Sequence, residues 1–247
     1  MRNNELDQTL VLIKPDAMKN SLTGYVLSQL SEFHTGLVFA ATKVVHVTRM
    51  LAEEHYAEHR GKAFYPSLIE YLTGHLHYPD EPHKRRIMAL VYQGPDAIEK
   101  VREIAGPTNP HNAREQRPGC IRALGTIMPL KNAEDEEIEE RMDNLIHASA
   151  SLEEAEREIK LWFKPDDIPP FMRAFAATHC EDHFYYKDDR LFSTYEPGSL
   201  CLLAPGDVVW ESDLQALQLI SQGLPAPCSL PSIVAKHLVN RKVSVEW

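Results

Sequence analysis

The sequence N-L-I-H-A-S-A-S-L-E-E-A-E-R-E-I-K-L-W-F, residues 144–163, places a histidine in a turn of small residues ahead of a long amphipathic run. Ser151 is a favourable helix N-cap residue, and the acidic residues after it suit the positive end of the helix dipole. Apolar side chains recur at helical spacing from Ala155 through Ile159 to Phe163, which predicts a helix with one buried face. The other face, which we expect to lie in solvent, carries Glu154, Arg157 and Lys160.

His147 lies close to the N-terminus of this predicted helix, where free backbone N–H groups favour phosphate. Glu158 lies further along the helix and can orient the imidazole if the turn folds back over it. Histidine is a competent nucleophile for group transfer when a partner fixes its tautomer. Because a single histidine before a helix is more often a surface or capping residue, this assignment depends on the rest of the chain.

The composition is that of a globular protein of 247 residues, enough for one large domain or for a domain with an appendage. The formal net charge of −10 argues against a surface that binds nucleic acid, although it permits a local basic pocket. The four scattered cysteines predict reduced thiols rather than a disulfide framework. No apolar run is long enough to span a bilayer, and the N-terminus has no apolar signal segment. We therefore expect a cytoplasmic protein with no membrane partner.

Hydrophobic patterns predict alternating strands and helices in the first two-thirds of the chain. A buried strand over residues 9–13 ends at Lys14, where a lysine suits an anion, although a solvated lysine is the more common case. The further predicted elements are a helix over 24–33 with Phe33 on its apolar face, a β-branched run over 36–47, a helix capped by Thr48, a short helix from about Tyr65, a strand over 87–92 and a helix over 95–104 with Pro95 in its first turn.

A loop over residues 106–126 is dense in glycine and proline and contains Arg114, Arg117 and Arg122, with Arg102 on the helix before it. Guanidinium groups in such a loop bind phosphates, and an ordinary solvated loop is the competing interpretation. No G-x-x-x-x-G-K-[ST] motif occurs, which argues against a P-loop nucleotidase.

Two stretches are weak candidates for metal sites, and we expect no metal ligand in either. The first, in the loop over residues 75–86, consists of His75, His77 and His83. The second, in the C-terminal part, consists of His179, Cys180 and His183. The first set lacks the spacing of a tetrahedral site and has no cysteine nearby, and the second makes at most a partial site, with ordinary helix or loop residues as the competing interpretation. An acidic run over residues 133–140 is expected to be a solvated face or an insertion without chemistry.

Taken in order, these stretches resemble the nucleoside diphosphate kinase family. The motifs that carry the resemblance are T-L-V-L-I-K-P-D-A, H-Y-x-x-H-x-x-K-x-F-Y-P-S-L, G-P-T-N-P, R-P-G-x-I-R, and N-x-x-H-A-S-A-S followed by E-x-A-E-x-E-I-x-x-W-F. They cover residues 7–165, and their ordered conjunction is more specific than any one of them. Residues 166–247 have no counterpart in the resemblance, although their aromatic and apolar content indicates a segment that folds against something.

The resemblance implies an α/β (α+β) fold, a ferredoxin-like sandwich in which helices cover a four-stranded antiparallel sheet. We expect this domain over residues 1–165 and a C-terminal extension of unknown function over residues 166–247. The implied activity is ping-pong transfer of a γ-phosphoryl group from a nucleoside triphosphate to a nucleoside diphosphate through a phosphohistidine. Mg²⁺ is expected to be carried by the nucleotide phosphates, without a protein ligand. A homo-oligomer, at least a dimer, is also expected.

The resemblance also assigns roles to individual residues. His147 would be the nucleophile, and Glu158 would orient the ring through the nitrogen that does not attack. Lys14 and Asn144 would contact the ribose hydroxyl and the phosphate end. The residues expected to hold phosphate oxygens are Arg102, Arg122, Thr108 and His55. Tyr56 and Ser149 are expected to line the surroundings of His147. Phe64 would stack on the base, and Leu68 would pack beside it.

The chain departs from the family pattern H-G-S-D-S after the histidine, because Ala148 and Ala150 replace the glycine and the aspartate. A methyl group at Ala148 would strain the backbone if that position needed a positive φ, and Ala150 cannot accept a hydrogen bond. Arg141 falls where the family has an apolar residue on the other side of the base. Three insertions lie near residues 75–86, in N-P-H-N-A-R-E-Q-R-P-G, and at the acidic run.

These departures leave three hypotheses. The first is an active nucleoside diphosphate kinase. The second is a nucleotide-binding regulatory or scaffold protein that has kept the pocket with weak or no turnover. The third is a histidine phosphoprotein that passes its phosphoryl group to a protein acceptor.

Overall fold

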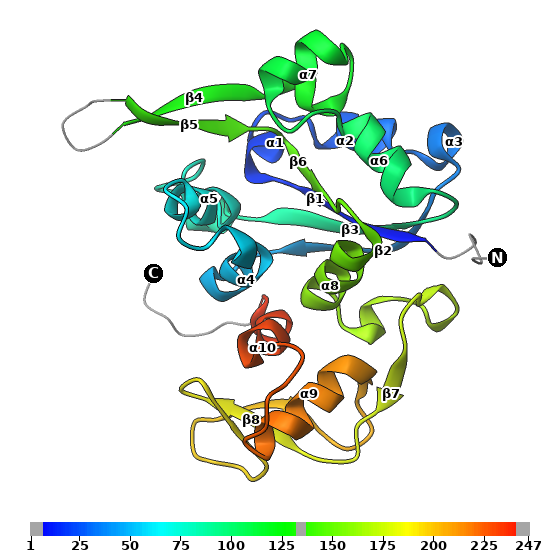
Figure 1. The fold of residues 1–247 in the computed structure, drawn as a ribbon, viewed down its shortest axis with the longest axis vertical. Helices are drawn as coiled ribbons and strands as arrows, with labels where there is room; N and C mark the ends of the chain where they lie inside the picture. Colours follow the sequence, from blue (N-terminus) through cyan, green and yellow to red (C-terminus); the bar gives the residue numbers. More distant parts are fainter. Residues whose placement is uncertain (1–6, 132–136, 241–247) are drawn as a thin grey trace.

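The computed structural model describes residues 7–131 and 137–240, and the side chains of residues 130–139 are outside the description. Its centre is a four-stranded sheet in the order β2-β3-β1-β6, in which every neighbouring pair is antiparallel (Figure 1). The four strands are β1 (Gln8–Ile13), β2 (Val38–Val45), β3 (Ile87–Gln93) and β6 (Ile146–Ala148). The predicted α+β fold with a four-stranded antiparallel sheet is confirmed.

Helices cover both faces of this sheet (Figure 1). They are α1 (Pro15–Lys19), α2 (Thr23–Gln29), α3 (Glu32–Thr35), α4 (Arg49–His55), α5 (Tyr65–Leu72), α6 (Ala97–Ala105), α7 (Pro110–Gln116) and α8 (Leu152–Trp162). A separate hairpin, β4 (Thr126–Lys131) with β5 (Glu137–Asp143), projects beside the sheet. The acidic run over residues 133–140 therefore lies partly outside the described residues and partly in β5.

Strand β1 is buried on both faces, because its alternating side chains enter two different hydrophobic clusters. Leu10 and Leu12 belong to the cluster beneath α4, α5 and α8. Val11 and Ile13 belong to the cluster shared with α1, α2 and α6. The continuous apolar run that predicted a buried strand thus serves two core layers.

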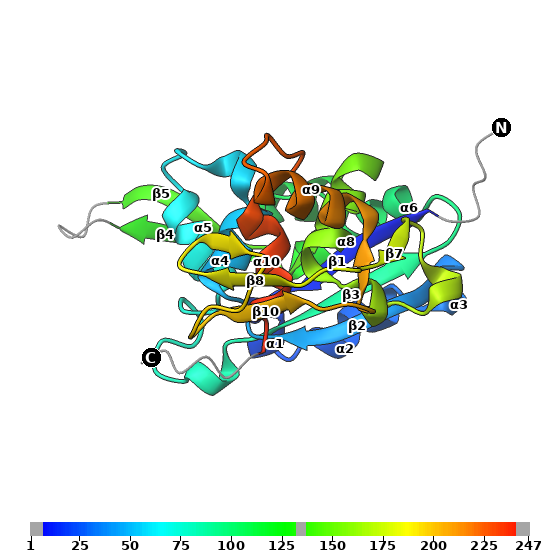
Figure 2. The ribbon, with the colours of Figure 1, turned by 90° about the horizontal axis from the view of Figure 1, so that it is seen from below.

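The C-terminal extension folds onto the helices that cover the sheet. Its strands are β7 (Ala177–His179), β8 (Phe184–Lys187), β9 (Arg190–Phe192), β10 (Leu200–Leu203) and β11 (Val208–Trp210), and its helices are α9 (Glu211–Ser221) and α10 (Leu230–Leu238). Figure 2 shows these elements in front of α4 and α8, and α10 packs against both helices. The extension has its own small apolar cluster around Phe184, Leu217 and Val234.

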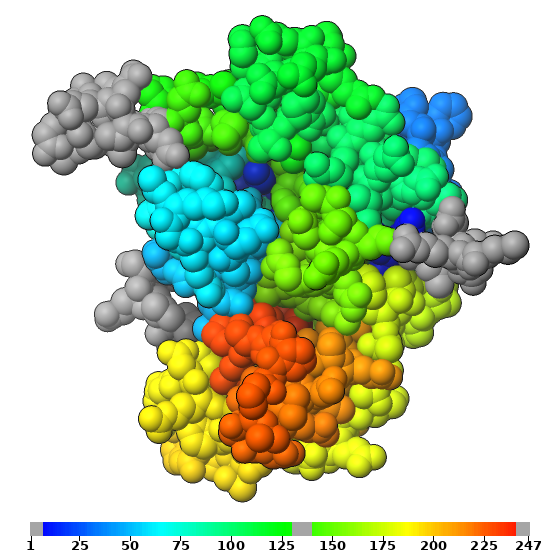
Figure 3. Space-filling view, viewed as in Figure 1, coloured from blue at the N-terminus to red at the C-terminus, as the bar shows by residue number. Residues whose placement is uncertain are grey.

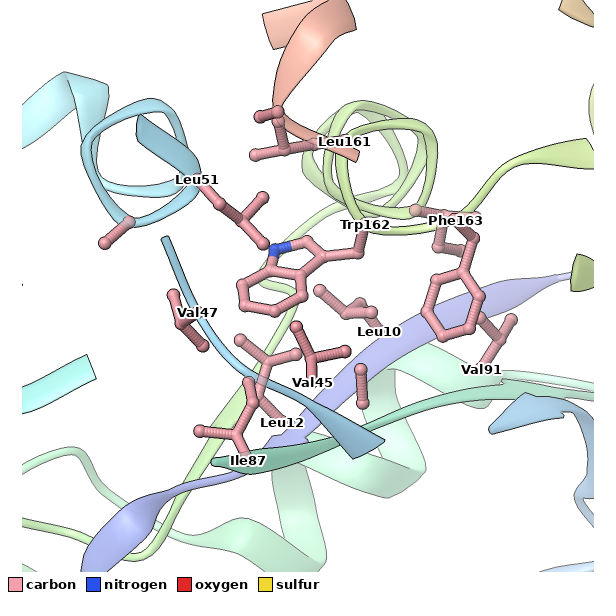
Figure 4. Close-up of a cluster of buried hydrophobic side chains, with 14 of the residues drawn as sticks. Leu10, Leu12, Val45, Val47, Leu51, Ile87, Val91, Leu161, Trp162 and Phe163 are labelled. Atoms are coloured by element: carbon pink, nitrogen blue, oxygen red, sulfur yellow. The ribbon is translucent and has the colours of Figure 1, made fainter. Parts of the chain in front are cut away.

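Three residues of the extension also enter the cluster beneath α8: Ile168, Trp210 and Ala235. Figure 4 shows that cluster, in which Trp162 and Phe163 at the end of α8 point toward β1 and its neighbours. Trp210 is fully buried, and its indole N–H donates to the carbonyl oxygen of Phe163 at 2.8 Å. The extension therefore completes a core that begins in the sheet.

The last described residue of the extension reaches the outer edge of the sheet. The side-chain amide of Asn240 donates to the carbonyl oxygen of Val44 and accepts from the backbone N–H of His46, both at 2.9 Å. In the described part of the chain β2 is an edge strand, so backbone groups near its end have no partner strand there. The Asn240 amide binds two of these groups.

Several predicted boundaries were wrong. The helix expected over residues 24–33 divides into α2 and α3 at Ser31, which turns the Phe33 side chain outward, 93% exposed. The helix expected from Pro95 begins at Ala97, because Asp96 adopts a left-handed conformation with φ of 54°. The strand expected to reach residue 47 ends at Val45.

Two predicted helix caps are confirmed. The Thr48 hydroxyl accepts from the backbone N–H of Leu51, and the Ser151 hydroxyl accepts from that of Glu154. In the described part of the chain, no helix combines the length and the apolar character needed to cross a membrane.

Candidate active site

His147 lies at the outer edge of the central sheet, in β6, where it pairs with Leu12 of β1. The prediction that it sits in a turn was therefore wrong, because β1 offers its free edge to residues 146–148. The turn comes two residues earlier, at Leu145, which has a positive φ of 69°. Such a conformation is strained for a branched side chain. The carboxylate of Asp16 stabilises it by accepting from the Leu145 N–H at 2.9 Å.

A buried carboxylate holds the imidazole of His147. The Nε2 atom of His147 donates to Glu158 Oε2 at 2.9 Å, and the Ser149 hydroxyl donates to the same oxygen at 2.7 Å. Burial alone would raise the pKa of Glu158, but the interactions with His147, His55 and Ser149 outweigh it and lower the pKa to about 2. Glu158 is therefore ionised, which assigns a proton to Nε2, and in the neutral imidazole of His147 the free lone pair is then on Nδ1.

His55 lies behind this pair. Its ring packs edge-on against that of His147, with centroids 4.5 Å apart, and its Nδ1 accepts from the indole N–H of Trp162 at 3.2 Å. Burial, and then the neighbouring His147, lower the pKa of His55 well below its ordinary value, so the ring is neutral. Because the side chain is fully buried and absent from the pocket wall, the expected phosphate contact of His55 has no geometric support.

The His147 side chain opens into a pocket of about 450 Å³ between α5, α8 and the β4–β5 hairpin. Figure 3 shows this region as a hollow between the cyan and the green segments. Besides His147, the predicted site residues in its wall are Lys14, Tyr56, Phe64, Leu68, Arg102, Thr108, Arg122 and Asn144. Ser149 and Glu158 lie behind His147, and both are buried.

Lys14 and Asn144 form the floor of one side of this pocket. The Lys14 ammonium donates to Asn144 Oδ1 at 2.7 Å and lies 4.9 Å from the centre of the Tyr71 ring. Burial lowers the pKa of Lys14 to about 8. The amide of Asn144 in turn donates to the Thr108 carbonyl oxygen at 3.0 Å, which joins two parts of the wall.

Of the four arginines in and before the loop over residues 106–126, two line the pocket. Arg122 is buried, donates to the Gly106 carbonyl oxygen at 2.8 Å, and has its pKa lowered by burial to about 10. Arg102 is the second. Arg114 and Arg117 instead hold the loop together, because Arg114 donates to the Gly125 carbonyl oxygen at 2.8 Å and Arg117 pairs with Glu103.

The two alanines after His147 are accommodated by their surroundings. Ala148 belongs to β6, is buried, and has no positive φ, so its methyl group causes no backbone strain. The N–H of Ala150 donates to a carboxylate oxygen of Glu154 at 3.0 Å. Glu154 thus supplies an acceptor at the turn, and the prediction that its side chain simply faces solvent was wrong.

Sequence reasoning missed a second buried network beside the pocket. Asp143 accepts from His77 at 2.9 Å and pairs side-on with Arg141 at 2.7 and 3.0 Å. Asp16 and Tyr71 were also missed, although the acidic residue directly after Lys14-Pro15 was a visible signal for Asp16. Nothing in the local sequence connects His77 with Asp143, since they are 66 positions apart.

One group in the described part of the chain has the proximity that a metal site requires: His55, His147 and Glu158, whose ligand atoms lie within 4.8 Å of one another. The two histidine sets weighed from the sequence do not form such a group among the described residues. His147 and Glu158 are joined by a hydrogen bond, and we therefore interpret this cluster as a hydrogen-bonded pair that shares a proton and not as a metal site.

Comparison with known proteins gives one consistent result. A profile of the nucleoside diphosphate kinase family matches residues 7–168. The chain is 40% identical over 187 residues to a nucleoside diphosphate kinase of Pyrococcus abyssi, covering 76% of this chain and 99% of that protein. It is 35% identical to the enzyme of that name from Thermus thermophilus, covering 66% of this chain and 99% of the relative.

Solved structures agree with the sequence relatives. The nucleoside diphosphate kinase of Aquifex aeolicus superposes with a TM-score of 0.52 at 32% identity, covering 66% of this chain and 99% of its own. A nucleoside diphosphate kinase family protein of Babesia bovis superposes with a TM-score of 0.51 at 28% identity, covering 68% and 95%.

Proposed function

The chain belongs to the nucleoside diphosphate kinase family and is a kinase, and from this premise we propose that it transfers the γ-phosphoryl group of a nucleoside triphosphate to a nucleoside diphosphate through a phosphohistidine on His147. The observation that carries the proposal is the 2.9 Å hydrogen bond between His147 Nε2 and the ionised Glu158. This bond directs the free lone pair of Nδ1 away from Glu158, on a side chain that lines a pocket.

In the first half-reaction, Nδ1 of His147 attacks the γ-phosphorus, and the bond from that phosphorus to the bridging oxygen breaks. The nucleoside diphosphate leaves with the electron pair of that bond. The imidazole then carries positive charge, which Glu158 stabilises through Nε2–H. In the second half-reaction, a terminal oxygen of another nucleoside diphosphate attacks the phosphorus, the nitrogen–phosphorus bond breaks, and neutral His147 returns.

The pocket supplies positive charge where this reaction needs it. Lys14, Arg102 and Arg122 line the wall with His147, and cationic donors stabilise phosphoryl oxygens during in-line transfer. We assign Asn144 and Thr108 to the same end of the nucleotide, and Phe64 and Leu68 to the base. Tyr56 and Ser149 surround the histidine in this proposal.

Mg²⁺ enters on the nucleotide phosphates in this proposal, with no protein ligand assigned. Mg²⁺ prefers oxygen ligands in octahedral geometry, and phosphates with water supply them. The cationic groups of Lys14, Arg102 and Arg122 suit phosphate oxygens rather than a metal ion. When bound, Mg²⁺ neutralises part of the charge on the transferring group.

Labelling with γ-labelled ATP and Mg²⁺ tests the proposal. The wild type, His147→Ala and the surface control His83→Ala would be incubated, quenched, and then chased with GDP. We expect acid-labile label on the wild type and the control, none on His147→Ala, and its release as GTP. Nucleotide binding without label in the wild type would contradict the proposal and favour the regulatory protein with a kept pocket. Label that passes to a protein but not to GDP would favour the phosphoprotein alternative.

We further infer a homo-oligomer, at least a dimer, and a cytoplasmic location. The outer edge of β2 supports the first inference, since Phe39 and Val44 there are 47% and 45% exposed. The four free cysteines support the second.

A further inference from the structure

An arginine takes part in the wall of the pocket beside an aromatic residue. Phe64, at the N-terminal end of α5, and Arg141, on β5, line the same hollow. Figure 1 shows the hairpin that carries Arg141 next to α5. Both side chains are therefore available to a flat ligand in this pocket.

The Arg141 guanidinium is held in a fixed plane. Its Nε and Nη2 atoms donate to the two carboxylate oxygens of Asp143 at 2.7 and 3.0 Å, a side-on pairing that fixes the orientation of the group. Arg141 and Asp143 are two positions apart on one strand, so both side chains leave the same face of β5. The pairing occupies the edge of the guanidinium and not its faces, and the side chain, which is 18% exposed, lines the pocket.

Asp143 is itself held from a distant part of the chain. His77 Nε2 donates to Asp143 Oδ2 at 2.9 Å, and both side chains are at most 10% exposed. Burial would raise the pKa of Asp143, but the hydrogen bonds from His77 and Arg141 lower it, so the carboxylate stays ionised. His77 comes from the loop over residues 75–86. A residue of this insertion therefore helps to position Arg141 through Asp143.

We propose that Arg141, positioned by Asp143 and His77, stacks its guanidinium plane on the nucleobase and makes this pocket prefer purine over pyrimidine nucleotides. The inference rests on the proposed function for its ligand class. A guanidinium over a π-face gains more from the larger, more electron-rich purine ring. Phe64 alone would stack on any base with little discrimination.

The first test compares binding of GDP, ADP, CDP and UDP by isothermal titration calorimetry in the wild type and three variants. Arg141→Met keeps the length and removes the plane and the charge, and Arg141→Lys keeps the charge without the plane. The matched control is Arg117→Met, an exposed arginine paired with Glu103 outside this pocket. We expect the wild type and the control to bind purines more tightly, and both Arg141 variants to lose about 3- to 10-fold in purine affinity with little change for pyrimidines.

Other patterns overturn the proposal. Equal weakening for all four nucleotides would place Arg141 at the phosphates or in the structure of the hairpin. Unchanged binding would remove it from the site. Retention of the purine preference by Arg141→Lys would show that charge, and not stacking, is responsible.

The positioning role of His77 has its own readout. His77→Ala removes the donor to Asp143, whereas His77→Gln retains one, so the purine preference should shrink in the first variant and return in the second. Failure of the glutamine variant to restore it would contradict the positioning role. These binding measurements do not require turnover, so they are independent of the proposed kinase mechanism. A protein that binds purines selectively through Arg141 but forms no phosphohistidine would contradict that mechanism and still support this inference.

Discussion

In the proposed mechanism, the contact between His147 and Glu158 makes the reactivity of the His147 nitrogen Nδ1 depend on a buried carboxylate. Glu158→Gln keeps the size of the side chain but removes the charge that stabilises the imidazolium and selects its tautomer. We expect the rate of phosphohistidine formation to fall roughly 10²- to 10⁴-fold, with nucleotide affinity nearly unchanged. Single-turnover labelling by quench flow measures the rate, and Glu153→Gln at the exposed start of α8 is the control. Equal rates for Glu158→Gln and the wild type would contradict this role.

The proposed role of Lys14 predicts that the reaction depends on pH on the alkaline side. Burial lowers the pKa of Lys14 to about 8, so the free enzyme loses this positive charge as the pH rises through that value. Because the proposed phosphate contact of Lys14 needs the charged form, we expect kcat/KM for nucleoside diphosphate to fall between pH 7 and pH 9. Lys14→Met should be slower throughout and should lack this fall. A wild-type profile that is flat over this range would exclude Lys14 as a phosphate-binding group.

At the residue scale, the sequence predicted contacts between side chains that are close in the chain or belong to one motif. His147, Glu158 and Ser149 lie within 12 positions, and one strand and one helix bring them together. The contact of His77 with Asp143 was not predictable, because it depends on how an inserted loop folds over a distant hairpin. His55 was predicted to hold phosphate, but a pattern of residues cannot tell a ring in the wall of a pocket from one buried behind it.

At the scale of elements, α8 lies between the sheet and the extension, and Trp210 packs at its C-terminal end. We expect Trp210→Ala to lower the free energy of unfolding by about 3–5 kcal/mol, because it leaves a large cavity and an unpaired carbonyl group at Phe163. Trp210→Phe fills most of the space and should cost much less. Urea denaturation followed by circular dichroism gives both values. A loss below 1 kcal/mol for the alanine variant would mean that the extension does not support α8.

Elements with strong apolar periodicity were placed correctly from the sequence, but several of their ends were not. β1, α8 and the caps at Thr48 and Ser151 follow from local hydrogen-bonding chemistry and burial. The break at Ser31 was missed, because the apolar residues on either side continue the helical spacing while the backbone turns. The start of α6 was missed because a non-glycine residue, Asp96, takes a left-handed conformation that proline at position 95 did not indicate.

At the scale of the molecule, the inferred dimer should show in solution. Among the residues that the structure describes, no strand pairs with the outer edge of β2, which also carries the exposed Phe39 side chain. Sedimentation equilibrium should give about twice the chain mass of 28.1 kDa, and Phe39→Lys should shift the protein toward the monomer, because an edge lysine opposes pairing. Phe33→Lys, which changes a still more exposed phenylalanine on α3, is the control. A monomeric wild type would exclude a stable dimer.

The position of Asn240 on the edge of β2 has a consequence for how the protein is made. A ribosome releases the N-terminal part of a chain first, so the sheet and the pocket emerge before α10 and Asn240 can reach them. Until α10 has been made, it cannot cover the outer surfaces of α4 and α8, and the apolar side chains that meet Ala235 and Trp210 face water. A chain terminated before α10 would therefore expose apolar surface, and we expect it to bind chaperones or aggregate instead of folding into a smaller active enzyme.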